Sequence, residues 1–462
     1  MKPVKVGLLP LYVKLYDDAL GWMRPRIDKF HETMVKKLED EGLEVLDHPL
    51  CRLESEFEDA IKEYESKGAE AIITLHLAYS PSLESEKPLK NCKLPIIILD
   101  TTPDFEFRPD GSPVGLDFDH GIHGVQDMCN LLTRNGVHYD ICAGHWEYSD
   151  VCRRVADLAR AYASANALSK MRVGIIGEPF NGMGDFRVPY GDLKKDIGIE
   201  VIDCPPSVIA GYREKVTDKR VDDQKKLDDH RFTNIDVPDE LYREVTKTSL
   251  AVRDWYEAEK LGAFTLNFLA AGKTTGLRHM TFDRACRAME DGVGYAGEGD
   301  VLTAALVGAL LNSWQNTTFV EMFCPNWNGG YLFLGHMGEY NIRIAARRPQ
   351  MRKRPFPFGD SGDPYALMAP MMPGRAAIVN LAPAGDGKFR LTAINGEMLT
   401  VPDNTQFEGL VNGWFKPDAP LDKMLEQYSL NGGTHHSAMI YGVRAESLRP
   451  IAYKFGWTFT VI

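Results

Sequence analysis

The sequence has no excess of positive charge and no long apolar run. Its 462 residues carry 53 basic and 65 acidic side chains, which gives a formal net charge of −12. Nucleic acids and anionic membranes bind positively charged surfaces, so this balance argues against either as a partner. No apolar stretch approaches the roughly 20 residues that a membrane-spanning helix needs. We therefore expect a globular protein that binds neither nucleic acid nor membrane.

Closely paired cysteines are also absent. The eight cysteines include no CxxC pair, and several fall inside predicted strands or helices. This pattern is typical of buried free thiols in a reducing compartment, because secreted domains usually use their cysteines in disulfides. The sequence therefore predicts a cytoplasmic protein.

A nucleotide-binding motif is missing as well. An apolar strand pattern over residues 171–176 enters the glycine-bearing loop Gly177-Glu-Pro-Phe-Asn-Gly-Met-Gly184. This loop contains neither GxGxxG nor GxxxxGK followed by Ser or Thr, the patterns that cradle phosphates. We interpret it as the first βα turn of a parallel-sheet domain, and a dinucleotide-dependent dehydrogenase is a weak alternative.

The first part of the chain alternates apolar strand patterns with amphipathic helix patterns. Strands are expected near residues 4–9, 43–46, 69–75 and 94–100, with helices near 24–38 and 54–66. Continuous apolar strands between such helices favour a parallel sheet that is covered on both faces. Ligands gather at the carboxyl ends of the strands in these sheets, where Tyr12, His76, Asp100 and Thr101 fall.

The predicted secondary-structure pattern changes beyond Trp314. Short strand-like pieces are joined there by glycine, proline and aspartate turns, which predicts an antiparallel β domain, either a sandwich or a barrel. We therefore divide the chain into an N-terminal α/β domain (1–168), a central α/β domain (169–316) and a C-terminal β domain (317–462).

Two segments stand out by their charge. Residues 215–239 are dense in charge and low in periodicity, and we expect a surface excursion there. Residues 347–354 contain five basic side chains. A solvated or subunit-contact loop is the favoured interpretation of this second segment, and binding of an anionic substrate is the alternative.

One part of the chain combines carboxylates, imidazoles and glycines. Glu298 lies in Gly294-Tyr-Ala-Gly-Glu-Gly-Asp300, Glu321 and His336 follow it, and the pair His435-His436 lies near the C-terminus. Two carboxylates with two imidazoles suit Mn²⁺, Co²⁺ or Mg²⁺ better than they suit structural zinc.

The local sequence around Glu298 favours a rigid turn. Gly297 and Gly299 flank the carboxylate, as backbone in tight or positive-φ turns would require. Asp300 is predicted to cap a helix over residues 301–311, whose apolar residues keep a helical spacing. The alternative is that Asp300 is only an N-cap and Glu298 only a solvated loop residue.

These motifs resemble those of a known family. Residues 294–300, Phe-Val-Glu321, Leu-Gly-His336-Met and Gly-Gly-Thr-His-His436-Ser follow the order found in the L-arabinose isomerases, within the wider arabinose/fucose isomerase superfamily. Upstream, His120-Gly-Ile-His123-Gly and Gly144-His145-Trp146 fit the same order, so the resemblance covers nearly the whole chain.

The resemblance carries expectations about architecture and activity. It implies two parallel-sheet, Rossmann-like α/β domains followed by a C-terminal antiparallel β-barrel domain. It also implies an intramolecular oxidoreductase that interconverts an aldose and a ketose with a divalent metal, usually Mn²⁺. The substrate would be a free pentose, hexose or deoxysugar. The protein would form oligomers, commonly hexamers, whose active sites are completed by a neighbouring subunit.

The resemblance also assigns the metal ligands. It implies that Glu298, Glu321, His336 and His436 bind the metal, and that the two glutamates also form the acid/base pair. We expect only one histidine of the pair to reach the metal, because adjacent strand residues point to opposite faces. His435 is then assigned to the substrate.

Further substrate contacts follow from the same resemblance. His123 resembles a residue donated across the subunit interface, with His120 nearby where the family has a glutamine. Phe268 resembles an aromatic wall of the sugar pocket, although it could simply belong to the core, and Tyr12 matches the tyrosine after the first strand. Leu9 departs from the family, which has an amide side chain there, so the identity of the sugar is open.

The chemistry accounts for these residue types. Moving a carbonyl between C1 and C2 requires a proton to leave one carbon and return to its neighbour, through a cis-enediol intermediate. A divalent ion chelated by both oxygens acts as a Lewis acid, while one carboxylate acts as base and the other moves the hydroxyl proton. A catalytically inactive sugar-binding or regulatory homologue is the competing hypothesis, and the presence of all four ligand positions argues against it.

Overall fold

A computed structural model describes residues 3–111, 113–273, 275–385, 388–400, 402, 405–407 and 409–462. The chain divides into two compact units, one up to Ala163 and the other from Ser164 to Ile462. Within the described ranges, no helix has both the length and the apolar character needed to cross a membrane.

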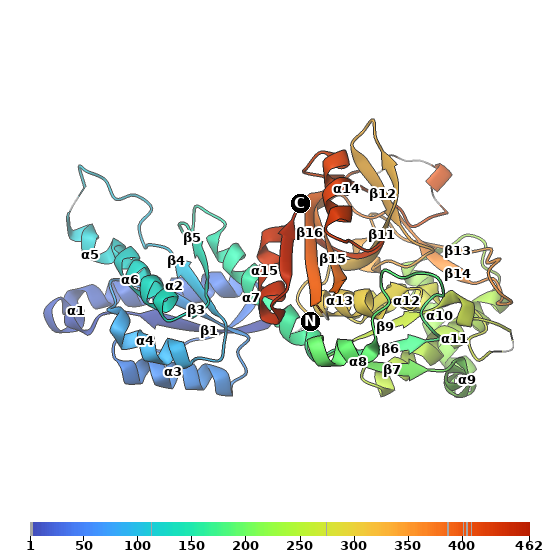
Figure 1. Ribbon diagram of the computed structural model, residues 1–462, viewed down its shortest axis with the longest axis horizontal. Coiled ribbons are helices and arrows are strands. Elements are labelled where there is room, and N and C mark those ends of the chain that lie inside the picture. The colour runs from blue at the N-terminus through green and yellow to red at the C-terminus, as the bar shows by residue number, and fades with distance from the viewer. Residues whose placement is uncertain are drawn as a thin grey trace. The chain divides into compact units, whose positions relative to one another are not determined.

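The first unit is built on a five-stranded parallel sheet with the strand order β2-β1-β3-β4-β5. Figure 1 labels β1, β3, β4 and β5 of this sheet. The strands are β1 (Val4–Leu11), β2 (Leu43–Leu46), β3 (Ala71–His76), β4 (Ile96–Asp100) and β5 (Asp140–Ala143). Their residues are almost all apolar, as expected for a sheet that is buried on both faces.

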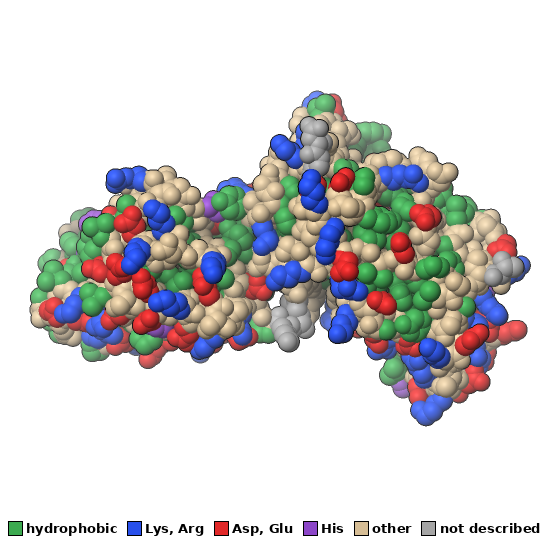
Figure 2. Space-filling model, turned by 60° about the horizontal axis from the view of Figure 1, so that its bottom comes forward, with side chains coloured by type: hydrophobic (Ala, Val, Ile, Leu, Met, Phe, Trp, Pro, Cys, Tyr) green, Lys and Arg blue, Asp and Glu red, His purple; other side chains and the backbone are tan. Residues whose placement is uncertain are grey.

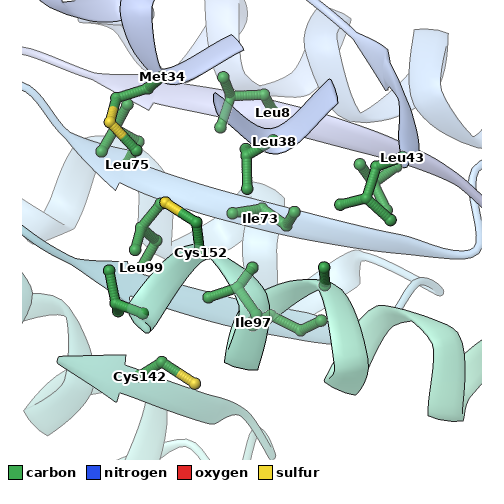
Figure 3. Close-up of a cluster of buried hydrophobic side chains, with 14 of the residues drawn as sticks. Leu8, Met34, Leu38, Leu43, Ile73, Leu75, Ile97, Leu99, Cys142 and Cys152 are labelled. Carbon is green, nitrogen blue, oxygen red and sulfur yellow. The ribbon is translucent and has the colours of Figure 1, made fainter. Parts of the chain in front are cut away.

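Helices cover both faces of this sheet. Helices α2 (Arg24–Asp40) and α7 (Val151–Leu168) pack on one face, whereas α3 (Glu54–Ser66), α4 (Ser82–Asn91) and α6 (Gly121–Arg134) pack on the other. Figure 3 shows the first of these layers, in which Leu8 and Ile73 lie beside Leu38 of α2 and Ile97 lies beside α7. Short helical turns complete the unit: α1 (Lys14–Ala19), η1 (Gly21–Met23), η2 (Pro113–Gly115) and α5 (Leu116–Asp119).

The second unit begins with a four-stranded parallel sheet of order β10-β9-β6-β7. Its strands are β6 (Arg172–Ile176), β7 (Glu200–Cys204), β9 (Ala263–Leu266) and β10 (Gly294–Gly297). The accompanying helices are α8 (Tyr190–Asp192), η3 (Leu193–Ile197), α9 (Pro206–Glu214), α10 (Asp218–Arg231), α11 (Asp239–Ala258), η4 (Phe268–Ala270), α12 (Phe282–Glu290) and α13 (Val301–Leu311). The predicted pair of parallel-sheet α/β folds is therefore confirmed.

The rest of the second unit is a closed antiparallel barrel. Six strands run in the order β15-β18-β11-β12-β17-β16, β16 pairs with β15 to close the ring, and β19 adds in parallel to β16. The strands are β11 (Thr317–Asn326), β12 (Tyr331–Gly335), β15 (Gly374–Gly385), β16 (Lys388–Met398), β17 (Gly413–Pro417), β18 (His436–Tyr441) and β19 (Thr458–Val461). Of the two β architectures left open by the sequence pattern, the barrel is the one formed.

Smaller elements surround the barrel. They are η5 (Ile342–Ile344), η6 (Thr405–Phe407), α14 (Leu421–Leu430), η7 (Ala445–Leu448) and α15 (Arg449–Phe455), together with a three-stranded sheet of β14 (Tyr365–Met368), β13 (Gln350–Lys353) and β8 (Thr233–Asn234). All three large sheets lie inside the predicted ranges 1–168, 169–316 and 317–462. The division of the second unit into two domains stays a prediction.

The two charged segments are more ordered than predicted. Residues 215–239 contain the helix α10, which is capped by Thr217. Ion pairs such as that of Lys219 with Asp223 (2.6 Å) lie along its surface. Opposite charges at i and i+4 stabilise a helix even where apolar periodicity is low, so the low periodicity of this segment did not indicate the helix. In the basic segment 347–354, residues 350–353 form the strand β13. Elsewhere on the surface, acidic and basic side chains are interspersed (Figure 2).

Candidate metal centre

Glu298 follows the edge strand β10 at the carboxyl end of the second parallel sheet. Its N–H donates to the carbonyl of Leu266 (3.1 Å), and its own carbonyl accepts from the N–H of Phe180 (2.8 Å). Its φ is 63°, in the left-handed region that costs a residue with a side chain about 1–3 kcal/mol. Two neighbouring segments therefore hold Glu298 in a strained backbone conformation, and its side chain is only 12% exposed.

The glycines beside Glu298 serve two different needs. Gly299 has a φ of 85°, so the predicted positive-φ turn is formed by Glu298 and Gly299 together. Gly297 is required for a different reason, because a Cβ there would stand 2.7 Å from Cε1 of His336. The sequence predicted a tight or positive-φ turn for both glycines, whereas Gly297 instead leaves room for an imidazole.

Asp300 joins the helix α13 to the histidine pair. One carboxylate oxygen accepts from the N–H of Thr303 (2.9 Å), which confirms the predicted N-cap. The other lies 3.0 Å from Nδ1 of His436, and both side chains are fully buried. Asp300 is thus more than a cap, since it also sets the direction of an imidazole.

The barrel brings three more functional side chains to this place. In the strand register, Glu321 of β11 lies opposite His436 of β18 on one side and opposite Gly335 of β12 on the other. His336 follows Gly335 directly, and its Nε2 lies 3.8 Å from Oε2 of Glu321. Residues more than one hundred positions apart therefore meet because they occupy adjacent strands.

These side chains form two overlapping groups that could hold a metal ion. Glu298, His435 and His436 make one group, and Glu321, His336 and His436 make the other, with the potential ligand atoms of each group within 4.8 Å of one another. His436 belongs to both groups, and its buried Nε2 has no hydrogen-bond partner among the described residues. Carboxylate oxygens and imidazole nitrogens are suitable donors for Mn²⁺ and similar divalent ions. The residues present therefore fit a divalent metal.

A buried carboxylate orients His336. Oε2 of Glu339 lies 2.8 Å from Nδ1 of His336, and Oε1 accepts from the hydroxyl of Tyr295 (3.1 Å). Burial works to lower the pKa of His336, but Glu339 and Glu321 outweigh it and raise that pKa. A carboxylate on Nδ1 fixes the ring and leaves Nε2 free to bind a metal. Our sequence reasoning missed Glu339, although its position three residues after His336 is a usable signal.

The surroundings of Glu298 favour its ionised form. Burial alone would raise the pKa of its carboxyl, but His435, His436 and His336 lower that pKa below its ordinary value. The carboxylate is therefore charged at neutral pH and can act as a metal ligand or a base.

The alternation of strand residues predicted that His435 and His436 point to opposite faces. In the structure they do not. The strand β18 begins at His436, so His435 precedes it and need not follow the alternation. The two rings lie 4.2 Å apart, and Nε2 of each is 3.6 Å from Oε2 of Glu298. Both histidines consequently face the same carboxylate.

Phe268 belongs to an aromatic cluster beside the Glu298 loop. Its ring lies 5.2 Å from that of Phe180, 5.5 Å from that of Phe358 and 6.4 Å from that of Phe356. Phe180 is also the residue whose N–H binds the carbonyl of Glu298. Phe268 is only partly buried, so this position suits a pocket wall as well as a core residue.

Three predicted substrate residues gather in the first unit. Tyr12 is buried, and its hydroxyl has no hydrogen-bond partner within the described ranges. Tyr16 packs against the ring of Tyr12, and its hydroxyl lies 2.9 Å from Nε2 of His120. The His120 ring is 5.4 Å from that of His123, which is exposed. These residues therefore form one polar group at the carboxyl edge of the first sheet.

Leu9 occupies a different environment from Tyr12. It is completely buried in the apolar cluster that includes Phe57, Tyr64 and Leu89, on the sheet face covered by α3, α4 and α6. Tyr12 belongs to the cluster on the opposite face. The packing thus gives Leu9 a core position, and its contact with a sugar stays a prediction.

Comparison with known proteins shows the family of the chain. Residues 193–313 match the family model of the L-arabinose isomerase central domain, and residues 316–456 match that of the L-arabinose isomerase C-terminal domain, together more than half of the chain. By class, the protein is an aldose–ketose isomerase. The chain belongs to the L-arabinose isomerase family, as its motifs predicted.

Full-length relatives support the same assignment. The chain is 27% identical over 365 residues to an L-arabinose isomerase of Nocardioides sp., covering 75% of this chain and 71% of that one. It is 26% identical over 418 residues to an L-arabinose isomerase of Geobacillus kaustophilus, covering 86% and 82%. Among solved structures, a solute-binding protein of an ABC transporter from Agrobacterium vitis aligns at 13% identity, covering 67% and 87%, with a TM-score of 0.17, too low to support any argument.

Proposed function

We propose that the protein is a metal-dependent isomerase that interconverts a free aldose and its 2-ketose through a cis-enediol, with Mn²⁺ as its metal and Co²⁺ or Mg²⁺ as substitutes. The observation that carries the proposal is the convergence of the two donor groups on the shared imidazole of His436. Glu298, Glu321, His336 and His436 would hold the ion. When bound, the ion would supply Lewis-acid polarisation of the sugar carbonyl.

The two glutamates are the proposed catalytic residues. The lowered pKa of Glu298 keeps its carboxylate ready to accept a proton. Glu321 lies on the barrel strand β11 and would move the second proton between the sugar oxygens. The exposed fractions of Glu298 and Glu321 are 12% and 21%, so bulk water has little access to either carboxylate. Such partial burial strengthens their interaction with a bound sugar.

The fixed imidazoles account for the precision of the site. His336 is 4% exposed and His436 is fully buried, and each has Nδ1 against a carboxylate. Only Nε2 of each ring then faces the glutamates, so both rings offer the same kind of donor atom. A site in which every ligand is already oriented loses little freedom when it binds an ion.

The substrate class follows from the family and from the walls of the site. Relatives of this chain are named L-arabinose isomerase, and we propose a pentose, hexose or deoxysugar as the substrate. Phe268 and its aromatic neighbours would cover the apolar face of the sugar. Leu9 departs from the family but packs in the apolar core, so it does not favour one of these sugars over another.

We further propose that the protein acts as a homo-oligomer in the cytoplasm. Tyr12, His120 and His123 would complete the site of a neighbouring subunit in a hexamer, and His435 would contact the sugar within its own subunit. The eight cysteines are all free, which supports a reducing compartment.

A panel of aldoses tests the proposed function. The metal-free protein should be incubated with arabinose, fucose, galactose and ribose, with and without Mn²⁺, and the ketoses should be detected by chromatography. We expect ketose only with Mn²⁺, and almost none from Glu298→Gln or Glu321→Gln. Sugar binding without ketose formation by any member of the panel would instead favour the inactive sugar-binding homologue.

A further inference from the structure

The glycine-bearing loop after β6 packs along the Glu298 turn. Phe180 in this loop donates its N–H to the Glu298 carbonyl, and Asn267 donates its side-chain amide to the carbonyl of Glu178 (2.5 Å). A Cβ on Gly299 would stand only 2.6 Å from Cα of Pro179. The loop that carries no phosphate-binding motif is therefore a close neighbour of the metal centre.

Further along the same loop, Asp185 holds His435. One carboxylate oxygen of Asp185 accepts from the backbone N–H of His435 (3.0 Å) and lies 2.6 Å from its Nδ1. The two contacts fix the backbone and the ring of the histidine with a single acceptor. Asp185 comes from the parallel-sheet part of the unit, whereas His435 directly precedes the barrel strand β18.

The next residue, Phe186, packs beside both histidine rings. Its ring is stacked on that of His436 at 5.4 Å and lies 5.7 Å from that of His435. On its other side Phe186 lines a cavity of about 430 Å³ with Arg187 and Tyr190. Asp185 thus restrains His435 at one edge, while the tilted ring of Phe186 lies beside it.

His435 needs such restraint more than the other histidines do. Its side chain is 31% exposed, whereas those of His336 and His436 are 4% and 0% exposed. Burial therefore confines the ring of His435 less than it confines the other two rings. In the observed rotamer its Nε2 is 3.6 Å from Oε2 of Glu298, without a hydrogen-bond partner in the part of the chain that the structure describes.

We propose that Asp185 is a positioning residue of the isomerase, which directs Nε2 of His435 toward a substrate oxygen beside Glu298. The inference rests on the proposed function of the site. His435 belongs to one of the two groups that could hold a metal, but the proposed ligand set is Glu298, Glu321, His336 and His436, so the proposal gives His435 to the sugar. Asp185 orients His435 through Nδ1, as Glu339 orients His336 and Asp300 orients His436.

The test compares Asp185→Ala and Asp185→Asn in the full-length, Mn²⁺-loaded protein. We expect Asp185→Ala to lower kcat/KM by about 10–100-fold, because the ring loses its orientation. Asp185→Asn keeps an acceptor oxygen and should recover most of that loss. The Mn²⁺ affinity, measured by calorimetry without sugar, should stay within about threefold, since the four ligands are untouched. Asp203→Ala removes an exposed carboxylate of β7 and is the matched control.

Three results would overturn the inference. Unchanged kcat/KM in Asp185→Ala would show that the contact has no role in turnover. A tenfold or greater loss of Mn²⁺ affinity would show that Asp185 supports a metal ligand instead. A crystal structure of Asp185→Ala with the His435 ring unmoved would remove the positioning role even if no aldose were turned over. Failure of the proposed function can be told apart from failure of this inference, because it would show as a lack of turnover in the unmodified protein.

Discussion

Gly297 lies against the imidazole of His336, so closely that a Cβ at position 297 would stand 2.7 Å from Cε1 of the ring. Gly297→Ala must therefore displace His336 from its place between Glu339 and Glu321. We expect the Mn²⁺ affinity to fall about 10–100-fold, the usual cost of disturbing the support of a ligand. Gly191→Ala, which adds a methyl group where no atom lies within 4 Å, is the control. Equal calorimetric affinities for the two variants would contradict this account of the ring.

The left-handed backbone at Glu298 lowers stability, although the carboxylate at this position is needed for the proposed function. Glu298→Gly and Glu298→Gln both remove the carboxylate, but only glycine adopts a φ of 63° without strain. In the metal-free state, the unfolding free energy of Glu298→Gly should be about 1 kcal/mol higher than that of Glu298→Gln. Both variants should lack turnover. Denaturant unfolding measures the difference, and a glutamine variant as stable as the glycine variant would mean that the strain is relieved elsewhere.

The burial of Leu9 predicts the outcome of restoring an amide there. Leu9 is 0% exposed in an apolar cluster, so Leu9→Gln would bury an amide at a cost of about 1–3 kcal/mol. We expect a lower Tm and no gain of kcat/KM for L-arabinose, whereas the volume-conserving Leu9→Met should change the Tm far less. If Leu9→Gln instead folds normally and prefers L-arabinose, Leu9 is a specificity residue.

A shared active site predicts complementation between inactive subunits. Glu298→Gln removes a proposed catalytic carboxylate, and His123→Ala removes the exposed histidine of the first unit. Each variant alone should be inactive. Mixing them under conditions of subunit exchange should restore part of the activity, because some interfaces then combine two intact halves. Demonstrated exchange without any recovery would place His123 outside the partner's site.

The local parts of this account were predictable from sequence. The cap at Asp300 and the helix after it follow from residues that are neighbours in the chain, and both were predicted correctly. The contacts of Asp185 and Glu339 were missed, because they depend on which strands and loops meet in space. The direction of His435 was predicted wrongly, since the alternation rule applies only within a strand and β18 begins one residue later. Closure of the barrel likewise rests on the pairing of β15 with the distant strand β18, beside its hairpin partner β16.

The central claim is that one divalent ion, held by Glu298, Glu321, His336 and His436, supports aldose–ketose isomerisation. The most direct measurement is a titration of the metal-free protein with Mn²⁺, in which bound ion and ketose formation are followed in the same samples. The account predicts that turnover rises in proportion to bound Mn²⁺ and reaches its plateau at about one ion per chain, and that Glu321→Gln weakens binding and turnover together. Full turnover by the metal-free protein, or Mn²⁺ binding that Glu321→Gln leaves unchanged, would contradict it.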